Sequence, residues 1–186
     1  MDVASTVALI LCPVGSQGRL WQTILRSQGV SVIWESADVD LIGTLASMQA
    51  DTHLLPDLIL VDTRLVRLKP YSICRWCKVH CPTVKVVLVN GAQVAISLSE
   101  REWARYQGAL DVLPRLPSQT LVSSAITYAR QIIAILGDAR LDSGALVTAL
   151  LKLGYRKPHQ AGDPISLNAP PAALTKTLHR LSQIQP

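Results

Sequence analysis

The segment PDLILVDTRL, residues 56–65, decides the fold. Its core is a continuous apolar run, LILV at 58–61, which is typical of a strand that is covered on both faces. Such strands occur mainly in parallel sheets that are flanked by helices. Asp62 ends the run, so we expect a carboxylate at the carboxyl edge of the sheet, where open α/β folds place their functional sites.

The sequence on either side repeats this pattern, because short apolar runs alternate with helical periodicities. The predicted strands are 7–11, 30–34, 58–61, 84–89 and 111–114. The predicted helices are 16–28, 38–48 with Asp38 as N-cap, 71–80, one that opens at the capping box 97–100, and 119–136. This alternation predicts a three-layer α/β fold, in which a doubly wound parallel sheet of five strand–helix units occupies residues 1–137.

Residues 138–186 are predicted to form a short helical C-terminal extension. Helical patterns cover 141–155 and 170–183, and the prolines near the start of the second suit a first helical turn. These helices either pack on the sheet domain or provide a surface for a partner or a second copy of the chain.

Composition excludes several classes of protein. The chain has 186 residues, of which 49% are hydrophobic and 17% charged, so it is too apolar for a disordered protein. No run approaches the roughly 18 apolar residues of a membrane span, and the start lacks the basic region of a signal peptide. We therefore predict a cytoplasmic protein. A net charge of +5 is spread along the chain, so a nucleic-acid partner is not expected.

The order of elements and two local strings resemble the receiver domain of bacterial response regulators. PDLILVDTRL resembles the strand that carries the phospho-accepting aspartate of that family, at the position of Asp62. GALDVLPRLP, residues 108–117, resembles the segment around its invariant lysine and the proline that follows. The resemblance covers about residues 5–136 and implies a flavodoxin-like (βα)5 fold.

Several residues depart from what this resemblance implies for phosphorylation. The acidic positions that would hold a divalent cation are Cys12 and Pro13, neither of which is an oxygen ligand that Mg²⁺ prefers. Asn90 stands at the Ser/Thr position, Arg115 at the lysine and Val112 at the switch aromatic. The set resembles that of pseudo-receivers, which bind partners without phosphotransfer.

Asp62 itself has two interpretations. One is an ion pair with Arg115 at the sheet edge, and the other is a working phosphoacceptor. The ion pair is favoured, because phosphoryl transfer without a metal leaves the developing charge without compensation.

The four cysteines are Cys12, Cys74, Cys77 and Cys81. The last three form a C-x2-C-x3-C-P pattern that resembles the tail of a ferredoxin cluster motif, so the four are the candidate metal ligands. On a helix, however, residues 74 and 81 lie about 10 Å apart, which is too far for one ion to reach both. We expect buried core thiols and no cofactor, with redox sensing or metal binding as the alternatives.

The predicted function is a non-enzymatic signalling or regulatory protein that acts by binding another protein, such as a kinase or a regulator. Arg101, Trp103, Arg105 and Tyr106 are the candidate contacts, because these residue types dominate interface hot spots. Alternatively, Trp103 faces the core and the arginines are solvated. A homodimer is also considered. Two other functions stay open, which are a phosphorylatable receiver that uses Asp62 and a redox- or metal-responsive regulator that uses the cysteines.

Overall fold

The computed structural model describes residues 6–49, 55–138 and 140–154. The chain divides into two units, Met1–Arg156 and Lys157–Pro186, and every described residue belongs to the first. The predicted helix at 170–183 therefore lies outside the described residues.

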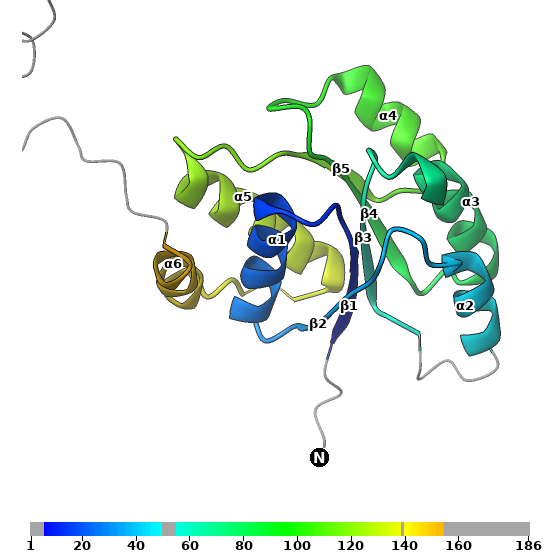
Figure 1. Ribbon diagram of the computed structural model, residues 1–186, viewed down its shortest axis with the longest axis horizontal. Helices are drawn as coiled ribbons and strands as arrows, with labels where there is room; N and C mark the ends of the chain where they lie inside the picture. Colours follow the sequence, from blue (N-terminus) through cyan, green and yellow to red (C-terminus); the bar gives the residue numbers. More distant parts are fainter. Residues whose placement is uncertain (1–5, 50–54, 139, 155–186) are drawn as a thin grey trace, which may run out of the picture. The chain divides into compact units, whose positions relative to one another are not determined.

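A five-stranded parallel sheet forms the centre of the described unit, as predicted (Figure 1). The strands are β1 (Val7–Leu11), β2 (Ser31–Trp34), β3 (Leu58–Asp62), β4 (Lys85–Asn90) and β5 (Asp111–Pro114). Their order is β2-β1-β3-β4-β5, so the winding reverses between β1 and β3. The carboxyl ends of these two strands meet at the point where doubly wound folds place their sites.

Helices cover both faces of the sheet and complete three layers (Figure 1). One face carries α1 (Ser16–Ser27), α5 (Leu121–Leu136) and α6 (Ser143–Lys152). The other face carries α2 (Leu41–Met48), the 3₁₀ turn η2 (Val66–Leu68), α3 (Pro70–His80) and α4 (Leu98–Tyr106).

Two apolar cores lie between these layers. Leu58 and Leu60 of β3 belong to the core under α1 and α5, whereas Ile59 and Val61 belong to the core under α2 and α3. This alternation follows from the two-residue period of a strand, and it explains why β3 is apolar at every position except its last.

Helix α2 begins later than the sequence predicts. Its N-cap is Asp40, whose carboxylate accepts a hydrogen bond of 3.1 Å from the backbone N–H of Gly43. The prediction of Asp38 as N-cap was wrong, because Asp38 instead forms an exposed 3.6 Å ion pair with Arg67. Both aspartates have the side-chain chemistry of a cap, and only the local backbone decides between them.

Helix α6 packs on the sheet domain, which was one of the two alternatives for this part of the chain. Leu146 and Leu150 are fully buried in the core with α1 and α5. The amide of Gln28 donates to the carbonyl of Asp142 and accepts from its N–H, at 3.1 and 2.8 Å. Over the ranges described, no helix is long and apolar enough to cross a membrane.

Candidate functional site

Asp62 ends β3 at the carboxyl edge of the sheet and is 1% exposed. It is held between β1 and β4, since β3 pairs with both strands and Asp62 stands opposite Val89. A buried carboxylate is costly unless a partner satisfies it, so its surroundings define what this edge can do.

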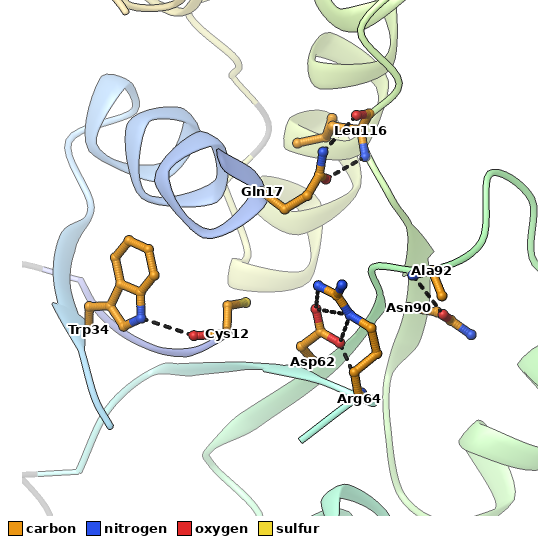
Figure 2. A network of polar contacts seen from close by, with 8 residues as sticks. All are labelled: Cys12, Gln17, Trp34, Asp62, Arg64, Asn90, Ala92 and Leu116. Atoms are coloured by element: carbon orange, nitrogen blue, oxygen red, sulfur yellow. Dashed lines mark hydrogen bonds and ion pairs between the residues drawn. The ribbon is translucent and has the colours of Figure 1, made fainter. Parts of the chain in front are cut away.

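Arg64 is the partner, and it binds both carboxylate oxygens of Asp62 (Figure 2). Its Nε donates to Oδ1 at 2.9 Å, its Nη2 donates to Oδ2 at 2.7 Å, and its backbone N–H adds a third bond to Oδ1 at 2.9 Å. The hydrogen bonds to Asp62 raise the pKa of the guanidinium, which stays charged. The predicted ion pair of Asp62 with Arg115 was wrong, because Arg64, two residues after Asp62, is its partner instead.

Gly91, which follows β4, makes room for this ion pair. A Cβ at this position would lie 2.3 Å from Nη2 of Arg64 and 2.7 Å from Oδ2 of Asp62. The guanidinium therefore lies over Asp62 because residue 91 has no side chain. Sequence reasoning missed both Arg64 and Gly91, although an arginine two residues after the strand and a glycine after the next strand were the available signals.

Cys12 places a neutral group at this edge, where the receiver resemblance implies an acid. Burial raises the pKa of its thiol to about 12, and the negative charge of Asp62 acts in the same direction. Its backbone carbonyl accepts from the indole N–H of Trp34 at 3.2 Å (Figure 2). Pro13, which follows it, is half-buried and offers no side-chain ligand, so Asp62 is the one carboxylate among the predicted pocket residues.

Asn90 and Arg115 do not join Asp62. The amide of Asn90 donates to Glu100 at 2.9 Å and accepts from the N–H of Ala92 at 3.2 Å. Arg115 is exposed, and its backbone N–H donates to the carbonyl of Gln93 at 2.8 Å. Of the predicted pocket residues, the structure thus brings Cys12 and Asp62 together. The side chains of Asn90 and Arg115 lie apart from them.

Gln17 closes the same edge from the other side (Figure 2). Its amide donates to the carbonyl of Leu116 and accepts from the N–H of the same residue, both at 2.9 Å. These two hydrogen bonds connect the start of α1 to the segment after β5. Sequence reasoning missed it, since a side chain that binds backbone leaves no pattern in the sequence.

The cysteines are all buried, as predicted. Cys12 lies in the core under α1 and α5, whereas Cys74, Cys77 and Cys81 lie in the core on the opposite face of the sheet. Burial raises the pKa of Cys74 and Cys77 to about 12 and also raises that of Cys81. The two faces therefore separate Cys12 from the other three, so the four do not form one ligand set.

The candidate contacts on α4 fall into three groups. Trp103 and Tyr106 are 55% and 76% exposed and stack with ring centroids 5.9 Å apart, so Trp103 does not face the core. Arg101 turns inward to an ion pair of 2.7 Å with Asp111, and Arg105 is exposed. Their role in binding a partner stays a prediction.

No protein-family model and no curated protein matches this sequence. Solved structures match in fold. A response regulator from Thermotoga maritima is 13% identical, with a TM-score of 0.54 over 72% of this chain and 99% of that one. A response regulator in red light signaling of R. palustris is 12% identical, with a TM-score of 0.52 over 73% of this chain and 96% of that one. The described unit thus has the flavodoxin-like fold of response regulators, as predicted.

Proposed function

We propose that this protein is a degenerate receiver, a non-enzymatic signalling or regulatory protein that acts by binding another protein and does not transfer phosphate. In this proposal it is cytoplasmic, and its partner is a kinase or a regulator. The observation that carries the proposal is the guanidinium of Arg64 on both oxygens of Asp62.

This ion pair opposes phosphotransfer in two ways. A carboxylate attacks phosphorus through an oxygen lone pair, and here both oxygens already accept charge-assisted hydrogen bonds. The transfer also needs cations that neutralise the phosphoryl oxygens, which Mg²⁺ supplies when several oxygen ligands hold it. A thiol with a pKa of about 12 stands beside Asp62 instead of a second carboxylate.

The proposal is tested by incubating the protein with acetyl phosphate and Mg²⁺ and measuring its intact mass. We expect no gain of a phosphoryl group, whether or not Mg²⁺ is present. Asp62→Asn is the matched control, since it removes the acceptor oxygen and keeps the size of the side chain. A phosphoryl adduct on the wild-type protein that Asp62→Asn abolishes would show a working receiver and refute the proposal.

A further inference from the structure

A second feature lies at the opposite, amino edge of the sheet, between α3, α4 and the start of β4. A pocket of about 240 Å³ opens there, with Val84, Val86 and Leu110 among its apolar walls. Three cations surround it, namely Lys78 from α3, Lys85 from β4 and Arg105 from α4. No acidic residue lines it.

These three cations have no ion-pair partner among the described residues. The ion pairs that the described residues form are Arg64–Asp62, Arg67–Asp38 and Arg101–Asp111. Asp57 precedes β3, and its backbone carbonyl accepts from the N–H of Lys85 at 3.0 Å, whereas its carboxylate accepts from the backbone N–H of Val7 at 2.8 Å. Like charges that are gathered without a counter-ion create a local positive potential that attracts an anion.

The walls of this pocket are fixed by backbone contacts. Gly108 has a φ of +104°, and a Cβ there would lie 2.8 Å from the carbonyl oxygen of Cys74 and 3.1 Å from Cβ of Lys78. The N–H of Leu110 donates to the carbonyl of Val86 at 2.8 Å. The loop from α4 to β5 therefore lies close to α3 and is hydrogen-bonded to β4, so the pocket is preorganised and a ligand does not have to form it.

The size and lining of the pocket specify its ligand. Pockets for drug-sized ligands are typically about 300–1,000 Å³, so this one suits a single side chain better than a cofactor. Three cations around an apolar floor match an acidic group with an apolar neighbour. Leu110, which is 47% exposed at the pocket wall, offers a contact for that neighbour.

We infer that this pocket receives an acidic segment of the protein partner, with one carboxylate side chain between Lys78, Lys85 and Arg105 and an adjacent apolar side chain against Leu110. The inference rests on the proposed function, because it names the chemistry of the partner that a degenerate receiver would bind. It places the contact at the amino edge, away from Asp62.

The test uses the full chain and a short peptide that alternates glutamate pairs with leucine. A matched peptide carries glutamine in place of every glutamate. Titrations followed by amide NMR shifts should show saturable binding of the acidic peptide, with the shifts centred on residues 85 and 108–110. Lys78→Ala/Lys85→Ala should weaken binding at least about tenfold, and added salt should weaken it further.

The control variant is Arg19→Ala/Lys152→Ala, which removes the same charge from exposed positions on the α1 and α6 side. It should keep the affinity of the wild-type protein. Equal weakening in both double variants would reduce the effect to the net charge of +5 and overturn the inference. An absence of peptide binding would overturn it as well.

Two further arms separate the sources of the anion. N-acetylglutamate and inorganic phosphate should bind much more weakly than the peptide, since they lack the apolar neighbour. If either binds as tightly as the peptide, the pocket is a small-anion site and the peptide assignment is wrong. The acetyl phosphate test at Asp62 reads the other edge of the sheet, so failure of the pocket and failure of the proposed function are distinguishable.

Discussion

The two edges of the sheet treat charge in opposite ways. At the carboxyl edge the buried carboxylate of Asp62 is bound by Arg64 from the same loop, and Gly91 leaves the space for that contact. At the amino edge, three cations surround a pocket without a described partner. One edge is electrostatically closed, and the other is open.

The difference follows from burial. A charge that is withdrawn from water must be paired inside the fold, because an unpaired buried charge lowers the free energy of unfolding by roughly several kcal/mol. Lys78 and Arg105 are exposed and Lys85 is half-buried, so these cations stay hydrated and can remain unpaired at little cost. The carboxyl edge, which holds Asp62, is thus paired within the fold, whereas the cations of the amino edge have no ion-pair partner among the described residues.

The largest expected effect concerns the reactivity of the thiols, because each edge of the sheet holds a buried cysteine. Burial raises the pKa of Cys12, beside Asp62, and of Cys77, at the amino-edge pocket, from 9.0 to about 12. At pH 8 the native protein should therefore hold about 1,000-fold less of either thiolate than the unfolded chain does. Labelling with a thiol-specific disulfide reagent should be slow in the native protein and fast in denaturant.

The same shifts set a pH dependence. The pKa of each thiol is higher in the folded protein than in the unfolded chain, so ionisation of the thiols favours unfolding. Their contribution to stability is therefore fully present below pH 9 and is lost as the pH rises toward about 12. Rapid labelling of Cys12 in the native protein would contradict the closed edge and restore the redox alternative.

Arg64→Ala should give the largest loss of stability. It leaves Asp62 buried without a countercharge, which costs about 3–5 kcal/mol in a fully buried pair. The side chain of Arg64 is 41% exposed, so water can reach the site, and we expect about 2 kcal/mol in the free energy of unfolding by urea. Asp62→Asn should recover about half of this loss when it is added to Arg64→Ala, since it removes the unpaired charge.

Arg67→Ala is the matched control for that measurement. Arg67 lies three residues further along, its side chain is 90% exposed, and its 3.6 Å ion pair with Asp38 is in solvent. Its removal should change stability by less than about 0.5 kcal/mol. If the two arginine variants were equally stable, the Arg64 ion pair would not be what closes the edge.

Gly91→Ala tests the space for the guanidinium. The added Cβ would overlap Nη2 of Arg64 and Oδ2 of Asp62, so the ion pair must shift or lose a hydrogen bond. The expected loss is about 1.5 kcal/mol, the lower end of the range for one hydrogen bond to a charged group. In the Arg64→Ala background the same change should cost much less, and a double-mutant cycle measures this coupling. Additive losses would mean that Gly91 and the guanidinium act independently.

The fold was predictable because it rests on long, repeated signals. The apolar runs at β1, β3 and β4 need no tertiary context, and their alternation with helices sets the parallel order. The start of α2 was not predictable to the residue, since Asp38 and Asp40 are equally good caps by type.

The site was predictable in position and not in pairing. The sequence correctly places Asp62 at the carboxyl edge, but its partner depends on how the loop after β3 folds back. Arg115 follows β5, and β4 lies between that strand and β3, whereas Arg64 needs only a two-residue turn. Contacts of this kind carry no periodicity, so sequence patterns do not reveal them.

The amino edge offers the smallest expected effect and the sharpest contrast with Arg64. Lys78→Ala/Lys85→Ala removes two cations that have no ion-pair partner among the described residues, so no buried charge is left behind. The free energy of unfolding should change by less than about 0.5 kcal/mol, because unpaired surface cations contribute little and repel one another. Urea unfolding of this variant beside Arg64→Ala measures both edges on one scale. A loss as large as that of Arg64→Ala would mean that the two lysines stabilise the fold through interactions within it. The charges of the amino edge would then be satisfied internally, as at the carboxyl edge.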